Sequence, residues 1–337
     1  MKKIVTFGEP LLRYSTSTGK RIEQSGELNI HYGGAEVNVS VSLANFGYDA
    51  YFIGKIPENG LGKAVERHLK SYGVHTDYLI KGGERLGTYY LELGAGERSS
   101  QVIYDRKYSS FAEIKLEEID FEEIFTGAEL YHVTGITPAL SPALQELTML
   151  SLQKAREMGV ITSFDFNYRS KLWTHKEAAT AIQPFLPYID ICSCGELDAI
   201  HLLDIEEITD EMDRELRLEH YYKEILKRYS NIKHLYSTFR DVNSASIHHL
   251  QGNYYYDGIL YQSKIHHVDP IVDPVGGGDA FAAGMLYGIL ENLPCEQTVS
   301  FATAGAALKH TLVGDANQFS KEEIFSFVDQ VSGKIIR

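Results

Sequence analysis

Hydrophobic and polar positions along this chain follow two periods, one typical of buried strands and one typical of helices. Short runs rich in β-branched and aromatic residues predict strands, and apolar positions that recur every three or four residues predict helices. We expect strands near residues 4–8, 51–54, 130–133, 160–166, 189–193 and 234–236, and a local hairpin formed by 244–249 with 253–256. We expect helices near 35–47, 60–73, 141–157, 176–185, 279–290, 298–312 and 321–331, and a charged, partly solvated helical region over 206–229.

The strands and helices alternate regularly in the second half of the chain. Strands separated by helices of this length favour a mostly parallel β-sheet with helices on both faces, the α/β class. Neither an internal repeat nor a low-complexity linker interrupts the series. The pattern therefore predicts one principal domain over residues 1–337.

Two segments do not fit the alternating series. Residues 13–32 show a period of two with many polar positions, which predicts an exposed ribbon, and 78–106 contain two strand-like runs around a glycine-rich turn, which predicts a β-hairpin. We interpret them as one small sheet beside the main fold, with strands within about 12–33 and 78–110. Such a sheet could serve as a lid over a ligand at the carboxyl ends of the main strands.

Composition narrows the class of partner and the compartment. With 337 residues, of which 44% are hydrophobic, the chain can bury a large core, and its net charge of −14 argues against nucleic acid or an anionic membrane as partner. Apolar runs stay well short of the roughly 18 residues that span a bilayer, so we expect a cytoplasmic protein. The cysteines, Cys192, Cys194 and Cys295, are expected to be buried side chains rather than a disulfide or metal site.

The stretch 271–288 is the strongest candidate for chemistry. A glycine run, Gly276, Gly277 and Gly278, precedes Asp279 at the expected start of a helix. Exposed backbone amides and the positive end of the helix dipole attract an anion, most plausibly a phosphate. Asp279 could then accept a proton from a substrate hydroxyl while the amides stabilise a transferring phosphoryl group. The alternative is a flexible turn followed by an N-terminal helix cap.

The full string D-P-x-G-G-G-D-A-F-A-A-G resembles the C-terminal signature of the ribokinase-like (PfkB) carbohydrate kinases, D-T-x-G-A-G-D-x-F, with Pro274 in place of Thr and Gly277 in place of Ala. The motif G-G-A-E-V-N at 33–38 is similar to the N-terminal glycine motif of that family. The motifs G-I-T-P-A-L-S-P at 135–142 and D-F-N-Y-R-S-K-L-W at 165–173 resemble the 2-keto-3-deoxygluconate kinase branch. The resemblance implies a ribokinase-like fold with a small β-sheet lid.

The resemblance also implies contacts to a sugar acid from six positions, and Asp279 would contact the same substrate. A substrate carboxylate favours arginine partners because the guanidinium offers a planar fork of donors; ordinary surface ion pairs are the alternative for both arginines. Tyr90 would replace the first tyrosine after a one-residue shift in the alignment. The six positions are Gly34, Tyr89, Tyr104, Arg106, Ile136 and Arg169.

On the nucleotide side, two family motifs are altered. The family's N-x-x-E reads Ser193 to Glu196 here, and its K-x-G-x-x-G loop reads S-T-F-R-D-V-N at 237–243. The resemblance implies that Glu196 helps to hold Mg²⁺ indirectly, through phosphate or water. It implies nucleotide contacts from Ser193, Glu196, Ser237, Arg240, Gly276, Gly278 and Thr303.

Together these observations predict an enzyme that uses ATP and Mg²⁺ to phosphorylate the terminal (C6) hydroxyl of 2-keto-3-deoxygluconate. One alternative is a kinase for a neutral ketose such as fructose. Another is a non-catalytic sugar- or nucleotide-sensing protein on the same fold, prompted by the altered loops. Because exposed lid strands tend to pair with another copy, we expect a homodimer through the lid, with a higher homo-oligomer also open.

Overall fold

The computed structural model describes residues 1–209 and 211–329 of the chain. The strands are β1 (Lys3–Phe7), β2 (Leu11–Ser15), β3 (Asn29–Gly33), β4 (Asp49–Ile56), β5 (Leu79–Lys81), β6 (Gly87–Glu92), β7 (Gln101–Asp105), β8 (Ala128–Thr134), β9 (Ile161–Asp165), β10 (Ile191–Ser193), β11 (His234–Ser244), β12 (Ile247–Tyr256), β13 (Ile259–Gln262) and β14 (His266–Val268). The α-helices are α1 (Ala35–Asn45), α2 (Gly60–Ser71), α3 (Phe121–Phe125), α4 (Ile136–Ala139), α5 (Pro142–Glu157), α6 (His175–Ile182), α7 (Glu196–Leu203), α8 (Arg214–Arg228), α9 (Gly277–Leu290), α10 (Cys295–Lys309) and α11 (Lys321–Asp329).

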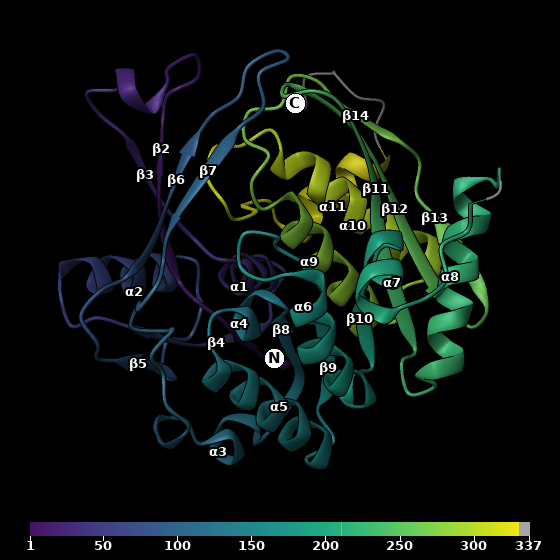
Figure 1. The fold of residues 1–337 in the computed structure, drawn as a ribbon, viewed down its shortest axis with the longest axis horizontal. Coiled ribbons are helices and arrows are strands. Elements are labelled where there is room, and N and C mark those ends of the chain that lie inside the picture. Colours follow the sequence, from purple (N-terminus) through teal and green to yellow (C-terminus); the bar gives the residue numbers. More distant parts are fainter. Residues whose placement is uncertain (210, 330–337) are drawn as a thin grey trace.

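A large, mostly parallel sheet forms the centre of the molecule (Figure 1). Its strand order is β13-β12-β11-β10-β9-β8-β1-β4-β5, with β14 paired to β12. The strands from β11 to β5 run parallel, whereas β12, β13 and β14 are antiparallel additions at one edge. The predicted α/β class with a parallel core is therefore confirmed.

Helices cover both faces of this sheet. Each face has its own core, because successive side chains of a strand point to opposite sides. In β1, Ile4 packs into the core beneath α1, α9, α10 and α11. Its neighbour Val5 packs into the second core, beneath α3, α5, α6, α7 and α8. Helices α9 and α10 carry many alanines and glycines, and Gly284 of α9 packs directly on Ala302 of α10. The small residues let these helices pack closely behind the candidate site.

The second sheet has the order β3-β2-β6-β7 and forms the lid beside the main sheet (Figure 1). Its strands come from the two segments that the sequence set apart. The prediction that 13–32 forms an exposed ribbon is wrong for β2, because Leu11, Leu12, Arg13 and Ser15 are all buried. The inner face of β2 packs against the main body, so polar character there reflects buried ion pairing rather than solvent exposure.

Other boundaries also differ from the sequence prediction. The expected hairpin of 244–249 with 253–256 is wrong: residues 247–249 and 253–256 belong to one strand, β12, and its hairpin partner is β11, which ends at Ser244. The 206–229 region becomes helical only at α8, after a stretch in which residue 210 lies outside the described part. The last two residues of the helix expected at 321–331 also lie outside it. Cys192 and Cys194 are buried as expected, whereas Cys295 is only half-buried.

The two long hairpins meet at their tips, at the top of the view in Figure 1. The amide of Ala245, in the β11–β12 turn, donates a hydrogen bond of 2.8 Å to the carbonyl of Gly96, in the β6–β7 turn. At a second contact, Lys171 Nζ donates a hydrogen bond of 2.5 Å to the carbonyl of Val102 in β7. The lid is therefore attached to the main body at the tip of its β6–β7 hairpin and along β7.

Candidate active site

The glycine turn lies at the N-terminus of α9, and its three glycines have different surroundings. Gly276 is the N-cap with φ of 80°, and an added Cβ would lie 1.7 Å from the carbonyl oxygen of Asp315. A Cβ on Gly277 would lie 2.3 Å from the ring of His310, whereas one on Gly278 would meet nothing within 4 Å. Packing thus requires glycine at the first two positions. The third leaves the positive end of the helix open to an anion.

Asp279 lies within the first turn of α9 and does not cap the helix, which removes the alternative that the sequence left open. Its Oδ2 accepts a hydrogen bond of 2.7 Å from Asn38 Nδ2, from α1. Burial raises the pKa of Asp279 to about 7, and the negative charges of Asp165 and Glu36 act in the same direction, against the Asn38 bond and Arg169. A carboxyl group with a pKa near neutral pH suits a general base.

Glu36, two residues before Asn38, ties α1 to the end of β8. Its buried Oε1 accepts hydrogen bonds from the Thr134 amide at 3.1 Å, the Thr134 hydroxyl at 2.8 Å and the Thr137 hydroxyl at 3.1 Å. Thr137 belongs to α4, whose first residue is the candidate Ile136. These bonds fix Ile136 and Asn38 relative to each other. They also account for the motif G-G-A-E-V-N, in which the acid is an internal anchor.

On the lid, the tyrosines separate onto two faces. Tyr89 and Tyr104 are directly opposite each other in β6 and β7, and Tyr89 also lies opposite Arg13 in β2. The Tyr89 hydroxyl donates a hydrogen bond of 2.5 Å to Asp315 in the main body. Tyr90 faces the other way and stacks on Tyr14 with ring centroids 5.3 Å apart. Of Tyr89 and its alternative in the alignment, Tyr90, it is thus Tyr89 that faces the site.

The predicted arginines occupy opposite environments. Arg106 is buried, and its Nε donates a hydrogen bond of 2.7 Å to Glu9 Oε2 in an ion pair with that carboxylate. Glu9 also lies behind Gly34, where φ is 130° and an added Cβ would lie 2.3 Å from the Glu9 carbonyl oxygen. Arg169 is exposed, and its Nη1 donates to the main-chain carbonyls of Asn167 and Tyr168. Arg106 is therefore already paired with an acid of the protein. Among the contacts described, the Arg169 side chain bonds only to main-chain carbonyl groups.

A cavity of about 690 Å³ opens at the carboxyl ends of β9 and β10 and along the middle of β11. It brings together the predicted residues Arg169, Glu196, Ser237 and Arg240. Arg240 is exposed, but neighbouring protein atoms partly desolvate its guanidinium group, and this desolvation together with the charge of Arg169 lowers its pKa. The two guanidinium groups therefore lie close enough to interact. Two neighbouring cations in one cavity attract an anionic ligand.

Two residues that were predicted to contact the nucleotide, Glu196 and Thr303, make contacts with other parts of the protein. Glu196 forms an ion pair with Arg217 of α8. Thr303 is fully buried in α10, where its hydroxyl donates to the Val299 carbonyl at 2.7 Å and packs against Gly252 of β12. Thr303 therefore supports the packing of α10 on the sheet and does not line the cavity.

Sequence reasoning missed three polar residues of the site: Asn38, Asp165 and Asp198. Burial raises the pKa of Asp165, and it raises the pKa of Asp198 to about 6. Both acids line the cavity, and Ser193 makes a hydrogen bond to Asp165. Asn38 and Asp165 lie inside motifs whose resemblance was recognised, so their polar character next to apolar neighbours was an available signal.

Among residues 1–209 and 211–329, no helix combines the length and the apolar character needed to cross a membrane.

Comparison with known proteins places this site in a family. The family model described as pfkB family carbohydrate kinase matches residues 1–322. The chain is 32% identical over 322 residues to a 2-dehydro-3-deoxygalactonokinase from Haloferax volcanii, covering 96% of this chain and 95% of that protein. It is similar to the solved structure of a 2-dehydro-3-deoxygluconokinase from Thermotoga maritima, with 39% identity, a TM-score of 0.94, and coverage of 98% and 100%.

A PfkB family carbohydrate kinase from Listeria grayi has a similar structure, with 41% identity, a TM-score of 0.93, and coverage of 98% of this chain and 100% of that one. The central sheet, the lid and the glycine turn with its acid thus occur together in a chain that resembles these kinases along nearly its whole length. The chain belongs to the pfkB family of carbohydrate kinases.

Proposed function

We propose that this kinase transfers the γ-phosphoryl group of ATP to the terminal (C6) hydroxyl of 2-keto-3-deoxygluconate (2-dehydro-3-deoxygluconate) or its galactonate epimer. The observation that carries this proposal is Asp279, held by Asn38 at 2.7 Å beside the open end of α9. Its pKa of about 7 keeps much of the carboxyl ionised at neutral pH. The names of the relatives from Haloferax volcanii and Thermotoga maritima support a sugar acid as the class of acceptor.

In the proposed step, Asp279 takes the proton of the C6 hydroxyl as its oxygen attacks the γ-phosphorus. The new O–P bond forms as the bond from the γ-phosphorus to the β,γ-bridging oxygen breaks, and ADP leaves. The amides of Gly276, Gly277 and Gly278 stabilise the charge on the transferring group, because they are oriented before the reaction begins.

We assign the carboxylate of the sugar acid to Arg169, and a supporting contact to Arg106 from the lid. Arg169 is exposed and shares its cavity with Arg240. Arg106 is bound to Glu9, so its remaining donors and the rings of Tyr89 and Tyr104 would shape the pocket rather than carry the main charge contact. Gly34 and Ile136 would border the sugar. A side chain at position 34 has no room.

We assign the triphosphate to Arg240, Ser237, Ser193 and the turn. Mg²⁺ fits the donor set, because Glu196 and Asp198 supply carboxylate oxygens to the same cavity, and oxygen ligands suit this ion. When bound, Mg²⁺ would neutralise charge on the phosphates. Glu196 would act indirectly, since Arg217 already pairs with it. Because ATP is the proposed donor, we infer a cytoplasmic location, and we treat 1–337 as one kinase domain with an inserted lid.

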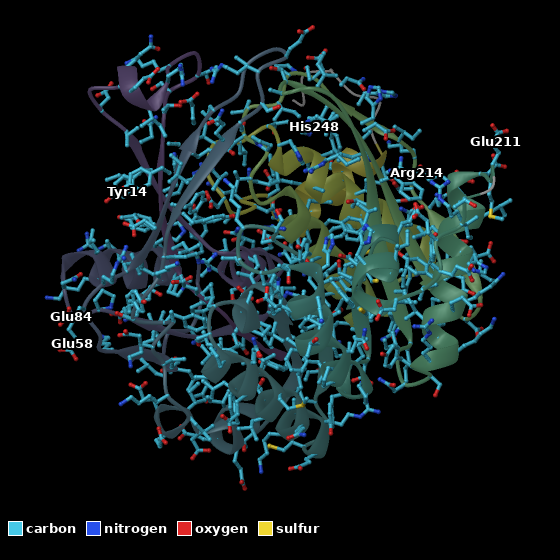
Figure 2. All side chains as sticks on the ribbon, viewed as in Figure 1. Tyr14, Glu58, Glu84, Glu211, Arg214 and His248 are labelled. Carbon is cyan, nitrogen blue, oxygen red and sulfur yellow. The ribbon has the colours of Figure 1, made fainter. Side chains whose placement is uncertain are left out.

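The outer face of the lid supports a homodimer. A row of apolar side chains crosses all four strands: Ile30 lies opposite Tyr14, Tyr14 opposite Tyr90, and Tyr90 opposite Ile103. Ile30 and Ile103 are 54% and 55% exposed, and Figure 2 shows Tyr14 on the side of the lid away from the main sheet. We propose that a second copy covers this row. Wild-type protein that is monomeric by light scattering at micromolar concentration would contradict the dimer; Ile103→Asp is expected to shift a dimer to monomer.

A panel of acceptors tests the proposed activity. Purified protein with ATP and Mg²⁺ is expected to release ADP with 2-keto-3-deoxygluconate or 2-keto-3-deoxygalactonate and to give a product phosphorylated at C6 by ³¹P NMR. Higher kcat/KM with fructose would favour the neutral-ketose kinase. Measurable ligand binding without ADP release from any sugar would favour the non-catalytic sensor.

A further inference from the structure

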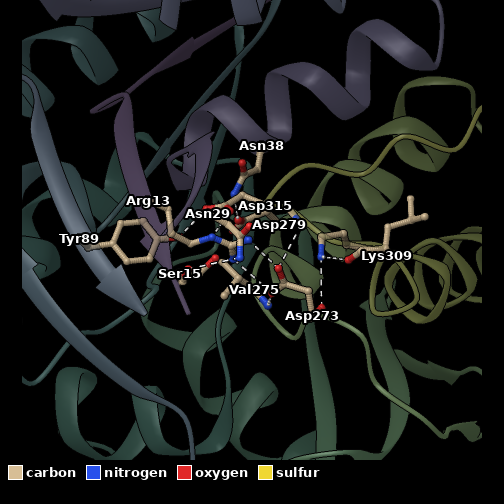
Figure 3. A network of polar contacts seen from close by, with 12 residues as sticks. Arg13, Ser15, Asn29, Asn38, Tyr89, Asp273, Val275, Asp279, Lys309 and Asp315 are labelled. Atoms are coloured by element: carbon tan, nitrogen blue, oxygen red, sulfur yellow. Dashed lines mark hydrogen bonds and ion pairs between the residues drawn. The ribbon is translucent and has the colours of Figure 1, made fainter. Parts of the chain in front are cut away.

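A buried ionic network lies directly behind the glycine turn, where Figure 3 shows Arg13 between Asp273 and Asp315. The Arg13 side chain is fully buried, and its Nη1 and Nη2 donate to Asp273 Oδ1 at 3.2 Å and Oδ2 at 2.6 Å. Arg13 Nε lies 3.1 Å from Asp315 Oδ1, and Tyr89 donates to the other oxygen of Asp315. A cation from the lid thus joins two carboxylates on either side of the turn.

Lys309, at the end of α10, adds a second cation to this network. It is fully buried, and its Nζ donates to the main-chain carbonyls of Asp273 at 3.2 Å and Leu312 at 3.4 Å. Burial lowers the pKa of Lys309, and the charges of Asp273 and Asp315 oppose that effect. The ammonium group therefore connects the backbone of two segments that are far apart in sequence.

Stability is a weak explanation for so many buried charges. Desolvation of buried ions often cancels their attraction, and well-packed apolar residues in their place are often as stable or more so. Both cations instead hold segments that touch the turn. Asp273 accepts hydrogen bonds from the amides of Val275 at 3.1 Å and Gly314 at 3.0 Å, and the Asp315 carbonyl lies where a Gly276 side chain would be. The network therefore sets the position of Gly276 from both sides.

We propose that Arg13 and Lys309 are positioning residues for phosphoryl transfer. They hold the segments 273–275 and 312–315 against Gly276, and so keep the amides of the turn directed at the γ-phosphoryl group. Because Arg13 belongs to β2, the same network fixes the lid that covers the acceptor to the turn that holds the phosphate. This inference rests on the proposed function, in which those amides form the anion site. Neither residue is assigned a contact with a substrate.

Lys309→Met tests the inference, because methionine has a similar length without the charge. We expect kcat with the keto acid to fall about 10- to 100-fold, since small misplacements of catalytic groups have effects of this order. The KM for the keto acid should stay within about threefold. ATP should also lose its binding advantage over ADP in calorimetry, because the γ-phosphoryl group would meet misdirected amides. These last two results separate positioning from a general loss of structure.

The matched control is Lys55→Met. Lys55 is also buried and bonded, to Glu118 at 2.6 Å, but it lies in β4 away from the turn. We expect its kcat and its ATP-to-ADP affinity ratio to match those of the wild type. A wild-type kcat in Lys309→Met, or equal losses of kcat in both variants at equal melting temperature, would overturn the inference.

Two further variants keep the test informative if Lys309→Met does not fold. Lys309→Met combined with Asp315→Asn removes one charge of each sign, so Arg13 and Asp273 remain as a neutral pair; we expect the same loss of kcat. In Lys309→Ala, methylammonium should restore part of kcat, and sodium at equal ionic strength should not. Lack of rescue, together with a wild-type kcat in the charge-balanced variant, overturns the inference. A wild type inactive with all acceptors contradicts the proposed function itself, and the inference falls with it.

Discussion

The glycine turn and the cavity beside β9, β10 and β11 are built differently, although the charges of Asp165 and Arg169 in the cavity act on Asp279 in the turn. Around the turn, side chains are held by one another: Asp279 by Asn38, and Asp273 by Arg13. In the cavity, Arg169 and Arg240 are exposed. The turn is held by contacts within the protein before any ligand arrives, whereas the arginines of the cavity have charges that a ligand could pair with.

This difference suggests separate contributions to catalysis. Groups fixed in advance stabilise the transition state and should affect kcat, while exposed cations contribute binding and should affect KM. Variants of the turn and of the cavity test this assignment of kcat to the turn and of KM to the cavity.

The largest expected effect comes from the first glycine of the turn. Gly276→Ala forces a side chain into a left-handed conformation, which costs about 1–2 kcal/mol, and adds a Cβ 1.7 Å from a backbone oxygen. We expect a large loss of stability and of turnover. Gly278→Ala is the matched control, because its Cβ meets nothing within 4 Å. Its melting temperature should be unchanged or higher, while kcat falls roughly tenfold or more because the methyl group faces the phosphate. Equal melting temperatures of the two variants would contradict this account.

The two predicted arginines should respond in opposite ways. Arg106→Met leaves the buried Glu9 without its cationic partner, which should cost about 3–5 kcal/mol of unfolding free energy in denaturant titrations. Arg169→Met should change stability by less than about 0.5 kcal/mol. It should instead raise KM for the keto acid about tenfold by loss of a charged contact. An unchanged KM for the keto acid in Arg169→Met would remove Arg169 from the carboxylate site.

The pH profile should reveal the base. With a pKa of about 7 in the ligand-free protein, Asp279 loses its ionised form as pH falls, so kcat/KM for the keto acid should drop about tenfold per unit below pH 7. Stability should move the other way. The folded state holds this proton more tightly than the unfolded state does, so the contribution of Asp279 to stability should rise as pH falls from 7 towards 4. In Asp279→Asn both dependences should disappear, and an unchanged acid limb in that variant would assign it to another group.

The smallest effect is expected at the donor end of the cavity. Arg240→Gln removes an exposed charge near the proposed triphosphate position, so KM for ATP should rise about fivefold, by loss of roughly one kcal/mol of binding. The kcat should stay within about twofold. Initial rates at varied ATP concentration measure both constants. A change in kcat without a change in KM would place Arg240 with the turn instead of the cavity.

Local patterns in the sequence were enough for much of the fold. The parallel sheet, most helices and the lid strands β6 and β7 follow from hydrophobic period and turn residues, because these depend on neighbours in the chain. The error at β12 arose because a long strand with mixed polarity resembled two short ones. The buried nature of β2 could not be read from its period, because its partners Asp273 and Asp315 lie more than 250 residues away.

The sequence predicts the part of the site that a single motif forms without distant partners. Gly276 to Asp279 needs only a loop that leads into a helix start, and the structure places the start of α9 there, after the loop that follows β14. The sequence does not show which residues of distant motifs pair with each other, as Asn38 does with Asp279 and Arg106 with Glu9. Thr303 shows the same limit, since an isolated threonine in a helix gives no sign of which neighbour it faces.

The most direct test of the central claim is the turnover of Asp279→Asn with ATP, Mg²⁺ and saturating 2-keto-3-deoxygluconate, measured beside the wild type at pH 8. If Asp279 is the base, kcat should fall roughly 10²-fold or more, while KM for both substrates and the melting temperature stay close to wild type. Turnover near the wild-type value in a folded Asp279→Asn protein would contradict the claim.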